Sequence, residues 1–345
     1  MKLSRYMWGA VAVGGLVAAR HLHRKKRHLE LSGRVILITG ATRGLGLVMA
    51  RQLSQAGAKV AICGRNQEEL DAACRQLSEL TSEFLGINCN VTDKVQVQEM
   101  MSHIQRHWGE VEVLINNAGI IQVGPMEHMN EEDYRQAINV HFWAPFNLIK
   151  EALPGMKASG QGRIVNIASI NGKVSFPHLL PYTVSKFALA GFSEGITSEL
   201  GRNNIRVTSV YPGLMRTGSP RNIDVKGRHK KEYAWFKVSD SLPGLSMDAE
   251  KAAAKIIKAM KYGKKVIGLG LPAKLAMAME GLVPGINLSF FDVADKLLPG
   301  TVDSHADSAD THKGYESESD ITKSMLTSKT TDAEKRNNER LKKRQ

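Results

Sequence analysis

Short apolar runs alternate with amphipathic stretches along most of the chain, and this pattern predicts a sheet covered by helices. The first run, residues 34–39, is apolar almost throughout, as expected for a strand buried on both faces of a parallel sheet. Further strands are expected at 59–63, 84–89, 111–116, 163–168, 206–210 and 265–268. Helices are expected at 44–55, 67–79, 94–107, 131–156 (with a bend near Pro145), 182–202 and 248–262. This alternation indicates an α/β fold with a Rossmann-type, doubly wound parallel sheet.

An apolar run at residues 6–19 precedes this pattern and is followed by a basic block at 20–27. A helix over the run is roughly 21 Å long, whereas a bilayer's hydrocarbon core is about 30 Å thick, so flanking aromatic and basic side chains would have to extend it. Three interpretations stay open: a membrane anchor, a signal peptide cleaved near Val17-Ala18-Ala19, and a buried helix of the folded domain. The basic block argues against export and favours an anchor, with the rest of the chain on the cytoplasmic side.

Four segments follow from these patterns: an anchor with a basic linker (1–32), a Rossmann-fold domain (33–270), a segment at 271–300, and a polar tail (301–345). The segment at 271–300 is apolar but broken by Pro272 and Pro284. It fits a packing helix, a flap over the substrate, or a second contact with the membrane. The tail is rich in Ser, Thr, Asp, Glu and Lys, and this composition predicts disorder.

The net charge of +13 raises the question of an anionic partner. Much of the basic excess in the folded part lies at residues 221–237, without an aromatic-basic repeat or a helix-turn-helix pattern, so no nucleic acid partner is expected. The three cysteines, Cys63, Cys74 and Cys89, lack metal-ligand spacing. We therefore expect no metal, and we interpret the cysteines as small buried residues in a reducing compartment.

Residues 39–46 read TGATRGLG and join the first expected strand to the first expected helix. The glycines let the backbone turn tightly and approach a pyrophosphate, which then meets the helix N-terminus. The second strand ends Cys63-Gly64-Arg65, without the acidic residue that holds the ribose hydroxyls of NAD. Arg65 and Arg43 suit a 2′-phosphate instead, so the sequence predicts NADP(H) as the cofactor.

Tyr182 and Lys186 stand four residues apart and so share one face of a helix. A free phenol titrates near 10, and the Lys186 cation together with an oxidised nicotinamide would lower that pKa toward neutrality, as a general acid/base requires. Ser169 ends the fifth strand, where its hydroxyl can hold a substrate oxygen and stabilise developing charge on it.

Together these motifs resemble the short-chain dehydrogenase/reductase family over about residues 33–268. The resemblance rests on TGATRGLG, NNAG at 116–119, Asn139, Ser169, YTVSK at 182–186 and YPG at 211–213. It implies a seven-stranded sheet in a single domain, and a homo-oligomer formed through the two long helices. The implied catalytic residues are Asn139, Ser169, Tyr182 and Lys186. The implied cofactor-binding residues are Gly40, Thr42, Arg43, Gly44, Leu45, Gly46, Arg65, Asn90, Val91, Asn117, Ala118, Gly119, Tyr182, Lys186, Pro212, Gly213 and Thr217.

Some of these residues receive specific roles from the resemblance. Asn117 is implied to support the sheet and the cofactor, and Asn139 to position a water in a proton relay to Lys186. The backbone after Pro212, together with Thr217, is implied to contact the carboxamide. The chain departs from the family at Asn90, where many members have Asp facing the adenine amino group; the amide oxygen of Asn90 can still accept that hydrogen bond.

These features predict an NADPH-dependent carbonyl reductase or alcohol dehydrogenase for a small or lipid-like substrate. The alternative is a cofactor-binding scaffold or regulatory protein at a membrane, which would not need the Ser-Tyr-Lys-Asn set. An epimerase or dehydratase of the extended relatives fits poorly, because those proteins have a different glycine spacing. The expected lid, residues 218–242, is either a solvated helix with its aromatic residues inward or a basic surface facing an anionic membrane. In the second case an apolar pocket is expected to be lined by Phe176, Leu179, Leu214 and Met215.

Overall fold

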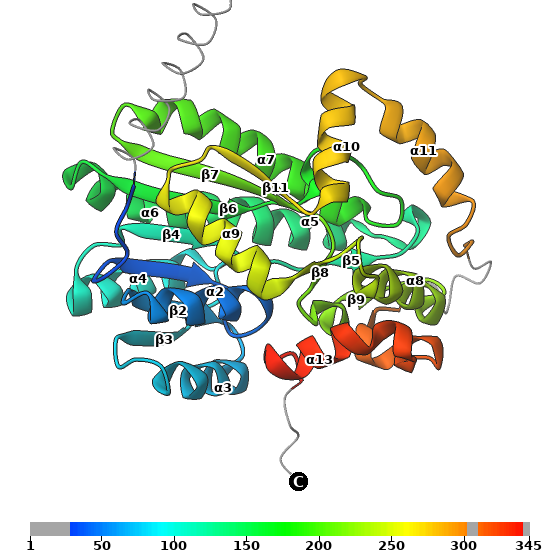
Figure 1. Ribbon diagram of the computed structural model, residues 1–345, viewed down its shortest axis with the longest axis horizontal. Helices are drawn as coiled ribbons and strands as arrows, with labels where there is room; N and C mark the ends of the chain where they lie inside the picture. Colours follow the sequence, from blue (N-terminus) through cyan, green and yellow to red (C-terminus); the bar gives the residue numbers. More distant parts are fainter. Residues whose placement is uncertain (1–27, 302–309, 341–345) are drawn as a thin grey trace, which may run out of the picture.

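The computed structural model describes residues 28–301 and 310–340, and within them seven parallel strands form one central sheet (Figure 1). The strand order is β11-β7-β6-β4-β1-β2-β3, so the chain changes direction across the sheet between β1 and β4. The strands are β1 (Val35–Thr39), β2 (Lys59–Gly64), β3 (Phe84–Asn88), β4 (Val113–Asn116), β6 (Gly162–Ile167), β7 (Ile205–Pro212) and β11 (Val266–Leu269). This order confirms the predicted doubly wound sheet, in which ligands bind at the carboxyl ends of the strands beside the point of reversal.

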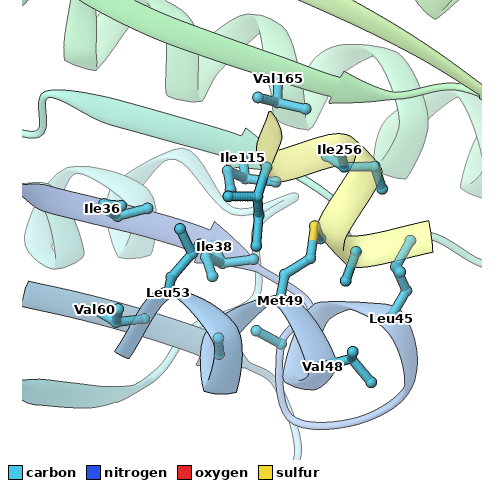
Figure 2. Packing of buried hydrophobic residues seen from close by; sticks show 14 of the residues in the cluster. Ile36, Ile38, Leu45, Val48, Met49, Leu53, Val60, Ile115, Val165 and Ile256 are labelled. Carbon is cyan, nitrogen blue, oxygen red and sulfur yellow. The ribbon is translucent and has the colours of Figure 1, made fainter. Parts of the chain in front are cut away.

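Helices cover both faces of the sheet. One face carries α2 (Gly44–Gln55), α3 (Gln67–Ser78) and α9 (Ala249–Lys261); the other carries α4 (Lys94–Trp108), α6 (Ala144–Ala158) and α7 (Leu180–Gly201). Met49 and Leu53 of α2 pack toward Ile38 of β1, with Ile256 of α9 beside them (Figure 2), and all four side chains are fully buried. Each such side chain contributes about 1.5–3 kcal/mol on burial, so this packing fixes where α2 begins relative to the end of β1.

Three helices near the carboxyl edge of the sheet begin with side-chain caps. Asn66, Asp93 and Asp248 accept hydrogen bonds from the first-turn N–H groups of α3, α4 and α9. The N-cap of α2 is Arg43, whose side chain makes no cap hydrogen bond, and the first turn of α2 has no acidic residue. The first N–H groups of α2 are therefore not satisfied by a local side chain, as an anion-binding helix start requires.

The expected long helix at 131–156 is interrupted. It consists of α5 (Glu131–Ile138), a π-helical segment (Asn139–Trp143) and α6, so the irregularity lies before Pro145 rather than at it. A proline ring inside a helix clashes with the carbonyl four residues earlier, which is that of His141. The wider π-helical turn accommodates this clash and places residues 139–143 against α7.

Smaller elements surround the carboxyl edge of the sheet. They are β5 (Gln122–Val123), β9 (Asp224–Val225) and β12 (His312–Lys313), which form a second sheet, the pair β8 (Met215–Arg216) and β10 (Met247–Asp248), and α8 (His229–Ser241). The segment predicted as a flap forms two helices, α10 (Leu271–Leu282) and α11 (Ile286–Asp295).

The prediction of a disordered polar tail is wrong for residues 310–340. In this segment β12 pairs with β9, and α13 (Ser328–Arg336) packs against α8 (Figure 1). Nζ of the buried Lys237 lies 3.1 Å from Glu334 and 3.5 Å from Glu318. Polar composition predicted disorder because it describes only the local chain, whereas the partners of these acidic residues lie on a distant basic segment.

Across residues 28–301 and 310–340, no helix combines the length and the apolar character needed to cross a bilayer. The expected membrane anchor belongs to residues 1–27, which lie outside the described part of the chain.

Candidate active site

The glycine loop, residues 39–46, joins β1 to α2 at the carboxyl edge of the sheet. Gly40 has a φ of +60°, and a Cβ at this position would lie 2.7 Å from the Cα of Ala118. A Cβ on Gly46 would lie 2.5 Å from the carbonyl oxygen of Gly40. Both positions therefore need glycine, and they leave the backbone bare where a pyrophosphate would approach it.

Asn117, which follows β4, holds the glycine loop in place. Its Nδ2 donates to the carbonyl oxygens of Thr39 at 3.0 Å and Gly40 at 2.9 Å. The hydroxyl of Thr39 in turn accepts from the backbone N–H groups of Asn117 at 3.0 Å and Ala118 at 3.1 Å. The structure thus places Asn117 where it holds the glycine loop against the end of β4, and its implied contact with the cofactor stays a prediction.

The two arginines expected at a 2′-phosphate have different surroundings. Arg65 is exposed directly after β2. The guanidinium of Arg43 lies 3.5 Å from Glu69 and 3.6 Å from Glu339, and the hydroxyl of Thr42 donates to Glu69 at 3.1 Å. The sequence analysis missed both glutamates, since Glu69 looks like an ordinary first-turn residue of α3 and Glu339 lies far away in the tail.

The amide oxygen of Asn90, expected to face an adenine, takes part in a local turn, and its contact with a cofactor stays a prediction. That oxygen accepts from the backbone N–H of Thr92 at 3.2 Å and from the Thr92 hydroxyl at 2.9 Å, so it closes a local turn. Short turns of this kind are a common use of Asn after a strand. Val91 beside it is buried in the core under α4.

Tyr182 and Lys186 lie near the start of α7, with the Lys186 Nζ 5.4 Å from the centroid of the Tyr182 ring. Lys186 is 4% exposed, and its Nζ donates to the carbonyl oxygen of Ile167 at 2.9 Å. Burial lowers the pKa of Lys186 to about 7. Burial also raises the pKa of Tyr182 to about 12, while a hydrogen bond with Ser169 lowers it. The Lys186 cation was expected to help lower the pKa of Tyr182. In the protein without a cofactor, burial raises that pKa instead.

Ser169 lies beside this pair, immediately after β6. It caps a short 3₁₀ helix, where its hydroxyl accepts from the N–H of Asn171 at 3.1 Å, and it is 7% exposed. Asn139 begins the π-helical segment that contacts α7; its side chain is exposed, and its carbonyl accepts from the N–H of Ala144. The proton relay through Asn139 to Lys186 stays a prediction.

His141 is a site residue that sequence reasoning missed. It is 1% exposed, and its ring packs edge-on against Tyr182 with 5.4 Å between the centroids. Its Nε2 accepts from the N–H of Ile120 at 3.2 Å, so its Nδ1 carries the proton that it shares with the Ser185 hydroxyl at 2.7 Å. Burial lowers the pKa of His141 below its usual range and keeps it neutral. A single histidine inside a helix gave no signal, because its partners lie on two other segments.

The segment after β7 completes the edge of the site. The N–H of Gly213 donates to Leu269 of β11 at 3.0 Å, which fixes the chain beyond Pro212. Thr217 is 3% exposed; its hydroxyl donates to Ser219 at 2.8 Å and accepts from the N–H of that residue at 3.1 Å. This segment and the glycine loop face the same region, because Asn337 of the tail bonds to both.

The expected lid does not present a continuous basic surface. Lys226 is buried with its Nζ 2.6 Å from Asp133, Lys237 pairs with Glu334, and Arg221 lies 3.5 Å from Glu318. The basic side chains of the segment that stay exposed are those of Arg228, Lys230 and Lys231. Tyr233 and Phe236 are buried. The arrangement therefore matches the interpretation in which the lid packs its aromatic residues inward, and its charges mostly serve internal pairs.

The predicted apolar pocket is not formed as a unit. Leu179 and Phe176 pack into one cluster with residues of α8 and β9, whereas Met215 packs against the core under α9. The Phe176 ring also lies tilted against that of Phe291 of α11, with 4.4 Å between ring centroids. His178 is a loop residue with a φ of +58°, and its Nδ1 lies 2.9 Å from the buried Glu232. Two of the four residues therefore lie beside α8 and α11, and the lining of a substrate pocket stays a prediction.

The arrangement has a clear chemical capacity. A glycine loop and a helix start without a side-chain cap of its own lie at the carboxyl end of β1, and such a loop and helix start can hold the pyrophosphate of a dinucleotide. Ser169 lies two residues after the end of β6, and Tyr182 and the buried Lys186 lie near the start of α7. Such a set can protonate or deprotonate an oxygen beside a hydride-transferring cofactor.

Comparison with known proteins agrees with this geometry. Residues 34–226 match the family described as short chain dehydrogenase. A putative ketoacyl reductase of Streptomyces coelicolor is 36% identical over 185 residues, which cover 53% of this chain and 71% of that protein. Dehydrogenase/reductase SDR family member 7B of Bos taurus is 32% identical over 261 residues, covering 73% of this chain and 78% of that protein. The crystal structure of a short-chain dehydrogenase from Streptomyces avermitilis superposes with a TM-score of 0.66 at 27% identity, covering 76% of this chain and 97% of that one. The chain therefore belongs to the short-chain dehydrogenase/reductase family, whose members are nicotinamide-dependent oxidoreductases of carbonyl and CH–OH groups.

Proposed function

We propose that the chain is an NADP(H)-dependent reductase that converts the carbonyl group of an apolar, lipid-like substrate into an alcohol on the cytoplasmic side of a membrane. The observation that carries the reductase part is the placement of Tyr182, Lys186 and Ser169 beside a glycine loop that fits a dinucleotide. Arg65 supports the choice of NADP(H), because it is exposed where the second strand ends, and residues 63–66 at that end include no carboxylate.

When bound, the nicotinamide supplies the hydride and, once oxidised, a positive charge next to the phenol. In the direction of reduction the Tyr182 hydroxyl donates its proton to the substrate oxygen as the hydride reaches the carbonyl carbon. The Ser169 hydroxyl donates a hydrogen bond to the same oxygen and stabilises the charge that develops on it. Lys186, whose pKa burial lowers to about 7, exchanges a proton at neutral pH and can restore the proton of the tyrosine.

The test is the oxidation of NADPH by the purified protein with a panel of carbonyls, from small diketones to 3-oxoacyl thioesters and ketosteroids, with NADH in parallel. Tyr182→Phe removes one hydroxyl and should lower turnover by about 10²–10⁴-fold, the usual contribution of a general acid. Tyr262→Phe, which removes a hydroxyl at the end of α9, is the matched control and should keep its activity. Binding of NADPH without turnover of any carbonyl would favour the scaffold alternative.

The apolar surface of α10 and α11 supports the lipid-like substrate and the membrane. These helices pack through Ala273 and Phe291 against Ile170, the residue after Ser169. Their outward side chains include Leu282, 81% exposed, and Phe290, 67% exposed. Exposed apolar patches of this kind mark contacts with membranes, apolar ligands or proteins, and this one borders the substrate side.

The membrane proposal predicts a difference between two forms of one substrate. In the full chain, Leu282→Glu with Phe290→Glu should slow turnover of a ketone embedded in lipid vesicles and leave turnover of a soluble ketone unchanged. Val95→Glu is the control, because Val95 is 62% exposed on α4, away from this surface. Equal rates on the embedded ketone for both variants would reject a role of α10 and α11 at the membrane.

A further inference from the structure

Three residues that follow α13 lie directly on the glycine loop. The carbonyl oxygen of Asn337 accepts from the N–H of Gly44 at 2.9 Å, and Nδ2 of Asn338 donates to the carbonyl oxygen of Thr42 at 2.8 Å. The carboxylate of Glu339 lies 3.6 Å from the Arg43 guanidinium. Asn337, Asn338 and Glu339 are 0%, 8% and 5% exposed, so this contact is a buried interface and not a loose surface one.

The backbone of this segment is shaped for the contact. Asn338 has a φ of +59°, a left-handed conformation that asparagine tolerates better than most residues. Nδ2 of Asn337 also donates to the carbonyl oxygen of Thr217 at 3.1 Å, so the segment spans from the glycine loop to the chain after β7. These are the two edges between which the family resemblance places the cofactor.

The groups that the segment uses are those that a dinucleotide needs. The N–H of Gly44 is a first-turn donor of α2, where a phosphate would bind, and Arg43 is one of the two arginines suited to a 2′-phosphate. The fit is tight, because a Cβ on Gly44 would lie 2.7 Å from Oε1 of Glu339. A phosphate and the Glu339 carboxylate therefore cannot both occupy the space in front of Gly44.

The contacts of α13 with α8 do not involve residues 337–339, although these residues continue from α13: the N–H groups of Asn337 and Glu339 donate to the carbonyl oxygens of Ala333 and Glu334 at 2.9 Å each. Glu334 of α13 is fully buried and pairs with Lys237 at 3.1 Å, and the hydroxyl of Thr330 lies 2.7 Å from that of Ser241. Arg340 adds to this anchoring from beyond the segment, with its Nε 2.7 Å from the Glu334 carboxylate, while Lys237 and Ser241 reach α13 without residues 337–339. The three residues can thus leave the loop by a local movement after Arg336.

We propose that residues 337–339 are an internal competitor of the cofactor, occupying the phosphate-binding edge of the site and withdrawing before NADP(H) binds. The inference rests on the proposed use of NADP(H). The carboxylate of Glu339 takes the place of a phosphate beside Arg43, and the carbonyl of Asn337 takes the place of a phosphate oxygen on Gly44. The apparent affinity for the dinucleotide is then set by the fraction of molecules in which the segment is withdrawn.

The test compares NADPH binding, measured by fluorescence titration, in the full chain and in a chain that ends after Arg336. The shortened chain keeps Glu334 and the rest of α13, and its apparent Kd should be lower by roughly tenfold or more, because apparent Kd is the intrinsic Kd divided by the competent fraction. Asn338→Ala should lower the Kd in the same direction, and Lys335→Ala, an exposed change one turn earlier, should not. A peptide of residues 328–345 added to the shortened chain should raise the apparent Kd in proportion to its concentration.

Equal Kd values in the full and shortened chains would overturn the inference. Weaker binding by the shortened chain would also overturn it, because the segment would then be part of the cofactor site. Absence of NADPH binding in every variant, the shortened chain included, would instead reject the proposed cofactor and the inference with it. Unfolding curves of each variant keep these outcomes distinct from a loss of folding.

Discussion

Replacement of Lys186 by methionine should abolish activity and yet stabilise the protein. Lys186 is 4% exposed and has one hydrogen bond to protein, to the carbonyl of Ile167, and burial lowers its pKa from 10.5 to about 7. At about 1.36 kcal/mol for each pKa unit, this difference is a cost of about 5 kcal/mol for the folded protein at neutral pH. Methionine has a similar length and no charge, so it removes that cost.

Part of the gain is offset, because the Ile167 carbonyl loses its donor, a penalty of about 1–3 kcal/mol for a buried group. The free energy of unfolding at pH 7 should therefore rise by about 2–4 kcal/mol. The sign of the pH dependence follows from the same values: between pH 7 and 10.5 the unfolded chain holds one more proton than the folded one, so the stability of the wild type rises with pH. The advantage of the variant should shrink by about 3 kcal/mol between about pH 7 and about pH 9.

Urea denaturation at the two pH values, followed by circular dichroism, measures both effects. Lys237→Met is the contrasting control, because Lys237 is 1% exposed but pairs with the fully buried Glu334. This variant removes one of the two cations that pair with the buried Glu334 and leaves it with Arg340 at 2.7 Å, so it should be less stable than the wild type, opposite in sign to Lys186→Met. A Lys186→Met protein that is less stable than the wild type at pH 7, or whose advantage does not change with pH, would refute the reasoning from burial.

Three further predictions concern the dinucleotide side of the site. Arg65→Ala should weaken NADPH binding by about 10–100-fold, since a hydrogen bond to a charged group contributes about 1.5–3 kcal/mol; titration with NADH should show no change, and equal losses would exclude a 2′-phosphate contact. Gly46→Ala should cost about 1–3 kcal/mol of stability in urea denaturation, because its Cβ would meet the Gly40 carbonyl. Gly195→Ala, whose Cβ would meet nothing within 4 Å, should be neutral or stabilising. Burial raises the pKa of Glu339 from 4.5 to about 7, with Arg43 lowering it and Glu69, Glu334 and the nearby Asp240 also facing it. The docked segment then holds one more proton than the free one between pH 4.5 and 7, so the apparent Kd for NADPH should fall as pH rises through this window in the full chain, and stay nearly constant in the chain ending at Arg336.

The sheet and the catalytic pair were predictable because their signals are local. Every residue of β1 and β4 is buried, so these strands appear as plain apolar runs, and the spacing of Tyr182 and Lys186 sets one helix face. The residues around the catalytic pair were harder to predict from the sequence. His141 acts through Ile120 and Ser185 on other segments, and Glu69 reaches Arg43 across a turn. Contacts of this kind depend on the packing of whole elements and leave no mark in the local pattern.

The order of the tail has a counterpart in the sequence, namely basic residues at 221–237 and acidic residues at 316–339. The basic excess at residues 221–237 fits either a solvated helix or a surface facing an anionic membrane, and neither interpretation includes a partner inside the same chain. Its partners Glu318 and Glu334 lie about a hundred residues later in a segment whose composition alone indicates disorder. Matching the two charge patterns would have predicted that one packs on the other, which is what β12, α13 and α8 do.

Residues 337–339 are synthesised after the segments of the dinucleotide site that they contact. The glycine loop, the β4 segment, α7 and the chain up to Thr217 all precede residues 337–339 and are therefore synthesised before them. A nascent chain that has folded this far presents its dinucleotide site without a competitor. The proposed competition therefore predicts an interval during synthesis in which the nicotinamide cofactor can bind without displacing residues 337–339.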